Sequence, residues 1–246
     1  MNDLFQSEHF TLHQLADGVY AAIATELGAG FSNAGLVDLG EQTLVFDAFE
    51  NHLAAADLLK ASQKLTGRKP SSVVISHWHP DHWGGLQVFA DNSILATLKT
   101  RRAMIPLSVE MLQDRQDPSR MEQVLRETEA LLAVGTEPTK HHALQVSIAR
   151  QRHDLAALPT LEPTLPNQTF EGKITFYGSL RSVELIATGK GHTISDCLLR
   201  LPQERVAFIG DLGFFQSQPF MPYGFPARWV KLLNDMVSWD IDTFVP

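Results

Sequence analysis

Short apolar runs separated by glycines dominate the first hundred residues of the chain. Each run has the length and apolar density of a β-strand, and the glycines provide turns between them. The runs lie at residues 20–24, 35–39, 44–46 and 72–75. Between the last two runs, small and apolar side chains recur every three to four residues from Ala55 to Leu65, and the segment stops at Gly67 and Pro70. This spacing predicts an amphipathic helix before the strand at 72–75.

Strand signals disappear in the middle of the chain, from about residue 106 to about residue 158. Asp117 and Pro118 are suited to be the N-cap and first residue of a helix, and the apolar stripe that follows ends near Gly135. Thr139 is suited to cap a second helix, which prolines after residue 158 would end. We therefore predict a helical insertion of two helices. It either roofs or flanks the functional pocket, or it packs only against outer helices or a second copy.

Strand-like runs return after the insertion and are followed by one further helix. They lie at residues 173–176, 183–187, 197–201 and 206–209. Residues 228–239 have the pattern of a closing helix, and a last strand is expected over 241–246. Two α/β halves around an insertion suit a four-layer αββα sandwich, in which two sheets pack face to face with helices outside. We expect residues 1–246 to form a single domain of this class.

Composition and charge narrow the classes of function. With 246 residues, 44% hydrophobic and 20% charged, the chain has ordinary globular composition. Its formal net charge of −8 disfavours a phosphate backbone as a partner, so no nucleic-acid binding is expected. No apolar run approaches the roughly 20 residues of a membrane span, and the first ten residues lack a leader pattern. These features favour a cytoplasmic protein without a membrane partner. The single cysteine, Cys197, is expected to be a buried strand residue.

The densest chemical signal is the sequence SHWHPDHWGG at residues 76–85, directly after the predicted strand at 72–75. It places three imidazoles and one carboxylate within six positions, and these are the ligand types that zinc and related transition metals prefer. Alternation puts His77 and His79 on one face, while Asp81 and His82 turn toward a second position. One loop at the carboxyl end of a strand is therefore suited to serve two metal ions.

The pattern H-x-H-x-D-H followed by two glycines resembles the metallo-β-lactamase superfamily, and other segments agree with it in order along the chain. Residues 33–39 and 43–47 resemble the family's first hairpin, which ends on an aspartate, here Asp47. Residues 189–193, with the sequence GKGHT, resemble its second histidine segment, and FIGD at 208–211 resembles its Gly-Asp segment. The resemblance covers both ends of the chain but not its middle, and it implies the αββα fold.

The resemblance also implies two sets of metal ligands. One metal has three histidine ligands and a fourth position for water, as in catalytic rather than structural zinc sites. The second metal takes an aspartate and a histidine of the motif, and a bridging carboxylate serves both metals. In this chain the first set corresponds to His77, His79 and His192, the second to Asp81 and His82, and the bridge to Asp211.

Further expectations concern the cofactor and the residues around the ligands. Two zinc ions are the expected cofactors, with manganese or iron as alternatives. Asp81 would orient the attacking hydroxide and is the candidate catalytic residue, whereas Asp47 is expected to orient the histidine loop without binding metal. Five aromatic residues near the motifs either line an apolar pocket or pack in the core. They are Trp78, Trp83, Phe214, Phe215 and Tyr223, and the insertion's His141, His142 and His153 are not expected to be ligands.

A bridging aspartate resembles the glyoxalase II and lactonase branches of the superfamily, while GHTISDCL at residues 191–198 also resembles class B β-lactamases. The best-known of those β-lactamases have a thiolate where this chain has a carboxylate. We therefore expect a hydrolase that uses a metal-bound hydroxide on a small-molecule ester, thioester, lactone or amide, β-lactams included. Two alternatives stay open: an iron-dependent oxidoreductase of the persulfide dioxygenase type, and a degenerate ligand-binding member with an incomplete second site.

A last expectation concerns the end of the chain. Members of the family continue past the strand expected at 241–246 into G-H-G, which supplies the last ligand of the second metal. The sequence stops at Pro246, and no other histidine of the chain replaces that ligand. We therefore expect the natural chain to continue, and the metal at His77, His79 and His192 to be held more firmly than the second.

Overall fold

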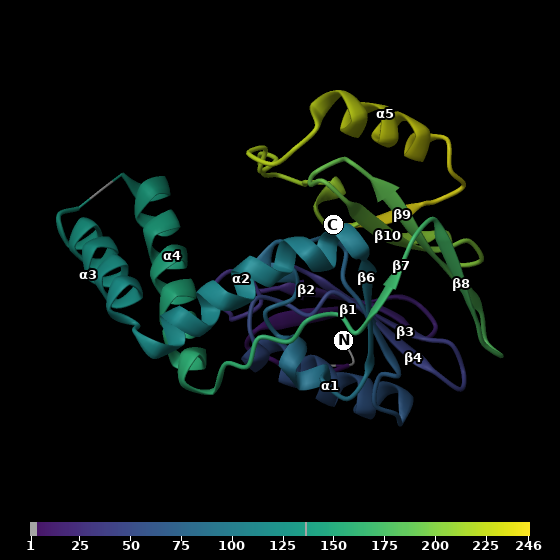
Figure 1. The fold of residues 1–246 in the computed structure, drawn as a ribbon, viewed down its shortest axis with the longest axis horizontal. Coiled ribbons are helices and arrows are strands. Elements are labelled where there is room, and N and C mark those ends of the chain that lie inside the picture. Colours follow the sequence, from purple (N-terminus) through teal and green to yellow (C-terminus); the bar gives the residue numbers. More distant parts are fainter. Residues whose placement is uncertain (1–3, 136) are drawn as a thin grey trace.

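Two β-sheets lie face to face between outer helices in the computed structural model, which describes residues 4–135 and 137–246 (Figure 1). Within those residues the first sheet has seven strands in sequential order: β1 Phe10–Ala16, β2 Val19–Ala24, β3 Ala34–Asp38, β4 Thr43–Phe46, β5 Ser72–Val74, β6 Ser93–Thr97 and β7 Gln168–Phe170. The second has five, in the order β12-β11-β10-β9-β8: β8 Lys173–Tyr177, β9 Ser182–Gly189, β10 Asp196–Leu201, β11 Val206–Phe208 and β12 Thr243–Val245.

The main core lies between the two sheets. Apolar side chains of the first sheet, such as Phe46 and Val74, pack there against Leu199 and Phe208 of the second. Cys197 of β10 is fully buried in the same cluster, as its apolar surroundings in the sequence predict. Strands β1 to β4 pair antiparallel, and β4 to β7 pair in parallel. Strands β4 and β5 are buried along their whole length, as the continuous apolar runs of parallel strands predict.

Helices cover the outer faces of both sheets. Helix α1, His52–Thr66, buries Ala54 and Leu58 against the first sheet, and it ends where Gly67 takes the left-handed conformation at φ 71°. Helix α5, Pro226–Val237, buries Trp229 and Met236 against the outer face of the second sheet. The predicted αββα class is therefore confirmed. In the part of the chain that the structure describes, no helix is both long and apolar enough to cross a bilayer.

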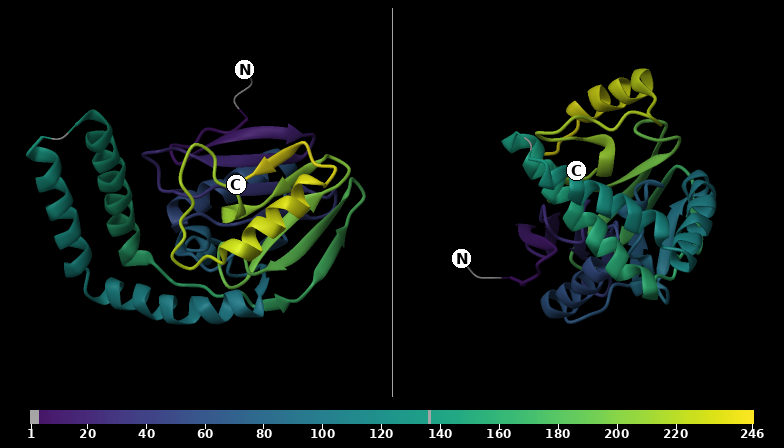
Figure 2. Two further views of the ribbon diagram at one scale, coloured as in Figure 1. Left: turned by 90° about the horizontal axis from the view of Figure 1, so that it is seen from above. Right: turned by 90° about the vertical axis from the view of Figure 1, so that its left-hand side faces the viewer.

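The described residues of the insertion form three helices, not two: α2 Leu98–Gln116, α3 Ser119–Ala133 and α4 Pro138–Ala157. The predicted start near residue 106 was wrong because Pro106 lies inside α2, where its missing N–H removes only one helical hydrogen bond. Thr139 lies inside α4 and caps nothing. Helix α2 runs outward from the sheets, and α3 and α4 form an antiparallel pair at its far end (Figure 2).

Candidate metal centre

The histidine loop after β5 lies tightly against the loop after β4. A Cβ added to Gly84 would lie 1.8 Å from the carbonyl oxygen of Glu50, and one added to Gly85 would lie 2.2 Å from that of Ala48. The Ala48 N–H donates to the carbonyl of His82 at 2.8 Å. The two glycines are therefore required for the close approach of the backbones. This contact places the metal-ligand candidates directly beside the end of β4.

Four side chains converge at the first cluster. The ring nitrogen Nδ1 of His79 lies 3.0 Å from Nε2 of His77 and 2.9 Å from Nε2 of His192. Oxygen Oδ2 of Asp211 lies 3.2 Å from Nε2 of His192 and 3.9 Å from Nε2 of His77. One ligand atom from each residue lies within 4.8 Å of all the others. Residues separated by more than a hundred positions in the sequence thus form one compact set of donors.

The other oxygen of Asp211 faces a second cluster. Oδ1 of Asp211 lies 3.1 Å from Nε2 of His82, and Oδ2 of Asp81 lies 3.5 Å from the same nitrogen. The structure thus brings together all six residues that the sequence nominated as ligands. A carboxylate with one oxygen toward each cluster has the arrangement that a bridging ligand needs.

The donor atoms fit a metal better than they fit one another. Nδ1 of His79 faces two imidazole nitrogens at hydrogen-bond distance, and a single proton or lone pair serves only one of them. Nε2 of His82 is buried without a hydrogen bond of good geometry, although two carboxylates lie beside it. Buried polar atoms left without partners are costly in the free protein. A cation at each cluster would satisfy them, and imidazole with carboxylate suits zinc, manganese or iron.

Electrostatic interactions within the site favour bound cations. Burial, together with His82, holds the pKa of His77 well below its usual value, and burial with His192 and His82 lowers the pKa of His79 to about 4. Both rings are therefore neutral near pH 7, as metal ligation requires. Burial raises the pKa of Asp211, but His82 and His192 outweigh it and hold that pKa far below its usual value.

The pKa of His82 is shifted in the opposite direction from those of His77 and His79. Burial lowers the pKa of His82, but Asp81, Asp211 and Asp47 together raise it well above its usual value. The surrounding carboxylates thus favour a positive charge at this ring. A proton provides it in the metal-free protein, and a metal ion on Nε2 would replace that proton.

Asp47 holds the histidine loop in place. It is 1% exposed, and its Oδ1 accepts from the backbone N–H of Ser76 at 2.7 Å. Its Oδ2 accepts from Ser76 Oγ at 2.7 Å and lies 2.8 Å from Nδ1 of His82. The Ser76 hydroxyl in turn lies 2.9 Å from Nδ1 of His77. Asp47 adopts the left-handed conformation at φ 60°, which is strained for aspartate. These contacts match the orienting role that its strand-end position predicts.

Replacement of Asp47 by asparagine is expected to lower zinc affinity about 10- to 100-fold, because the amide cannot accept from His82 Nδ1–H and Ser76 together. Zinc affinity is measured by competition with a chromophoric chelator. Asp38→Asn is the matched control, since Asp38 also ends a strand but pairs with Arg68, at 2.6 Å. Equal zinc affinity of Asp47→Asn and wild type would show that Asp47 does not orient the ligands.

Sequence reasoning missed the group that shapes the loop of His192. Both carboxylate oxygens of Asp196 accept from the backbone N–H of Thr193 at 3.0 Å, and Oδ1 also accepts from the Thr193 hydroxyl at 2.6 Å. This local turn fixes the residue that follows the ligand. Threonine and aspartate three positions apart are the signal that would have revealed it.

A pocket of about 650 Å³ opens onto the metal-ligand candidates. Of the five aromatic residues with open roles, four line it: Trp78, Phe214, Phe215 and Tyr223. Trp83 does not, because it is 0% exposed within the core. The insertion contributes Leu107 from α2 and Arg150 from α4 to the pocket wall, so it flanks the site.

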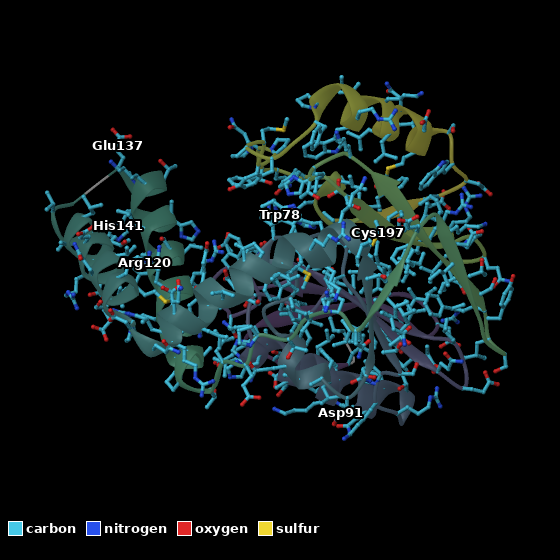
Figure 3. The ribbon with its side chains drawn as sticks, viewed as in Figure 1. Trp78, Asp91, Arg120, Glu137, His141 and Cys197 are labelled. Carbon is cyan, nitrogen blue, oxygen red and sulfur yellow. The ribbon has the colours of Figure 1, made fainter. Side chains whose placement is uncertain are left out.

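The three histidines of the insertion lie outside both clusters. His142 Nε2 lies 3.1 Å from a carboxylate oxygen of Glu26, and His153 Nε2 lies 2.9 Å from the carbonyl of Leu27. His141 lies in the projecting helical pair, away from Trp78 at the pocket (Figure 3). This agrees with the expectation that helix-surface histidines are not ligands.

Comparisons with known proteins give a matching family model and a partial match to a curated relative. The family model described as the metallo-β-lactamase superfamily matches residues 27–246. The chain is 35% identical over 75 residues to the atrochrysone carboxyl ACP thioesterase of Emericella nidulans, a match that covers 30% of this chain and 24% of that protein.

Solved structures show the same fold at low identity. A metallo-β-lactamase from Pontibacter korlensis has a TM-score of 0.62 at 16% identity, with 96% of this chain and 90% of that one covered. One from Erythrobacter litoralis, with β-mercaptoethanol in its active site, has a TM-score of 0.62 at 16% identity, covering 98% and 90%. The DIM-1 metallo-β-lactamase exposed to ceftazidime has a TM-score of 0.58 at 17% identity, covering 95% and 85%. This chain belongs to the metallo-β-lactamase superfamily.

Proposed function

We propose that the protein is a hydrolase of small esters or thioesters that depends on two divalent metal ions, zinc being the expected one. The observation that carries this proposal is the position of Asp211, whose oxygens lie 3.2 Å from Nε2 of His192 and 3.1 Å from Nε2 of His82. The first metal would be held by His77, His79 and His192, and the second by Asp81 and His82, with Asp211 shared.

When bound, the metal ions supply a Lewis acid and lower the pKa of water to near neutrality. The chain's own residues would position the reactants. Asp81 lies at the pocket wall with its side chain 18% exposed, so its carboxylate can orient a water molecule and accept a proton from it. The aromatic side of the pocket would hold the apolar part of the substrate and exclude bulk water from the reacting bond.

Two arguments favour esters and thioesters over β-lactams. The bridging position carries a carboxylate, not the thiolate of the best-known class B β-lactamases. The partial match to a thioesterase supports the same substrate class, although it covers only 24% of that relative's length. The β-lactamase structures share the fold at 16% or 17% identity and therefore carry no argument about substrate.

The test is a panel of chromogenic substrates with metal-loaded protein whose zinc content is measured. We expect kcat/KM for an aryl thioester or aryl ester to exceed that for a cephalosporin by about tenfold or more, a difference of ~1.4 kcal/mol in transition-state stabilisation. A cephalosporin hydrolysed fastest would overturn the substrate class. Oxygen uptake by the iron-loaded protein with glutathione persulfide, without hydrolysis of any panel member, would favour the oxidoreductase alternative instead.

A further inference from the structure

One wall of the pocket contains an arginine held in a fixed orientation. The Cζ atom of Arg150 lies 3.4 Å from the centre of the Phe31 ring, so the guanidinium stacks on its face. On its edge, Nε donates to both carboxylate oxygens of Glu50 at 2.8 Å, and Nη2 donates to Oε1. A planar cation fixed on one face and one edge is preorganised for recognition.

The remaining edge of that guanidinium is available to a ligand. Among the described residues, Nη1 of Arg150 has no hydrogen-bond partner, and the side chain is 37% exposed. No other lysine or arginine of the described chain lines this pocket. Arg150 lies on α4, so the helical insertion supplies this residue to the pocket.

Phe31 is unusual in both conformation and exposure. Its φ of 58° is left-handed, a conformation that strains a non-glycine residue. Its side chain is nonetheless 48% exposed, so burial of the ring offsets little of that strain. The ring stacks under Arg150 and lines the pocket, which indicates a role in the pocket.

Other residues that line the pocket are aromatic and exposed. Phe215, Phe220 and Tyr223 are 62%, 51% and 53% exposed, and all three line the pocket. The rings of Trp78 and Tyr223 contact each other edge to face, with 4.8 Å between their centroids. An exposed aromatic patch beside a polar site marks a surface that a ligand covers. Four of the metal-ligand candidates line the same pocket: His79, Asp81, His82 and Asp211. A ligand that covers the aromatic patch would therefore lie beside the proposed site of reaction.

We propose that the substrate is an aromatic ester or thioester that bears an anionic substituent. Its ring lies between Phe31 and the aromatic segment at residues 214–223, and its anion accepts hydrogen bonds from Nη1 of Arg150. This inference rests on the proposed hydrolase function, because it assumes that the reacting bond lies at the two metal clusters. Arg150 is then a specificity-determining residue, and Phe31 and Glu50 position it.

Burial affects the ionisation of the carboxyl groups near Arg150. Burial, reinforced by Asp154, raises the pKa of Glu50 to about 8, and burial raises the pKa of Asp154 as well. Burial lowers the pKa of Arg150, but its interaction with Glu50 outweighs burial and raises that pKa, so the guanidinium stays charged.

The test measures binding by isothermal titration calorimetry, which needs no turnover. The probes are 2-naphthoate, its neutral isostere 2-naphthamide, and the non-aromatic cyclohexanecarboxylate, each added to metal-loaded protein. We expect wild type to bind 2-naphthoate about tenfold more tightly than either of the others, the scale of one partly exposed charge-assisted hydrogen bond. Hydrolysis of neutral phenyl thioacetate, measured separately, reports on the proposed function alone.

Variants assign the preference to Arg150. Arg150→Gln is expected to reduce the naphthoate-to-naphthamide preference to about one. Arg152→Gln is the matched control, because Arg152 lies on the same helix but pairs with Glu129 at 2.7 Å. Phe31→Leu decides the question if Arg150→Gln fails to fold. Phe31 is half exposed, so its replacement leaves the core intact and is expected to weaken the preference several-fold.

Three results would overturn the proposal. The first is an unchanged preference for naphthoate in both Arg150→Gln and Phe31→Leu, which would place the carboxylate on the metal ions. The second is equal affinity of wild type for cyclohexanecarboxylate and 2-naphthoate, which would remove the aromatic requirement. The third is the absence of measurable naphthoate binding to wild type.

Discussion

Substitution of His192 by alanine is expected to reduce zinc affinity and thioester hydrolysis by roughly 1,000-fold or more, equivalent to about 4 kcal/mol, because three-histidine sites have no spare donor. Nε2 of His192 lies 2.9 Å from Nδ1 of His79 and 3.2 Å from Asp211, at the centre of the first cluster. The measurement is zinc content after dialysis together with kcat/KM.

The fold should survive this substitution. The turn that carries His192 is held by Thr193 and Asp196, whose hydrogen bonds do not involve the imidazole. His142→Ala is the control, because His142 is an exposed histidine that lies beside Glu26. Normal zinc content and full activity in a folded His192→Ala protein would remove this residue from the site.

The clustering of the metal-ligand candidates was predictable because the sequence signal for it is local and dense. The motif at residues 76–85 places imidazoles and a carboxylate so close together that only the loop's backbone has to bring them to one point. His192 and Asp211 each follow an apolar run, and strand ends that meet at one edge bring their side chains to the same place. The apolar runs that predict the strands therefore also predict where these two side chains lie.

The insertion was predicted less well because its helices have little core to face. Helix α3 buries none of its residues, and α2 buries only Thr100 and Met104, so apolar periodicity is a weak guide there. The role proposed for Arg150 depends on contacts with Phe31 and Glu50, which lie a hundred or more positions earlier. Contacts between residues so distant in the sequence cannot be predicted from local patterns of apolar and polar residues.

Substitution of Asp211 by asparagine tests the bridge itself and is expected to lower turnover by roughly 1,000-fold. The amide has the shape of the carboxylate, but it offers one oxygen instead of two and carries no charge. Since Oδ2 of Asp211 faces His192 and Oδ1 faces His82, both clusters lose a ligand or a compensating negative charge.

The comparison with Asp81→Asn distinguishes a bridging ligand from a ligand of one metal. Asp81 approaches only the second cluster, through the 3.5 Å contact with His82 Nε2, so its loss should leave the first metal bound. Asp211→Asn should instead weaken binding at both positions in a zinc titration followed by calorimetry. Two zinc ions bound with wild-type affinity in Asp211→Asn would falsify the bridging role. If both variants weakened zinc binding only at the second cluster, the two aspartates would be ligands of that one metal. A bridging Asp211 would have weakened zinc binding at the first cluster as well.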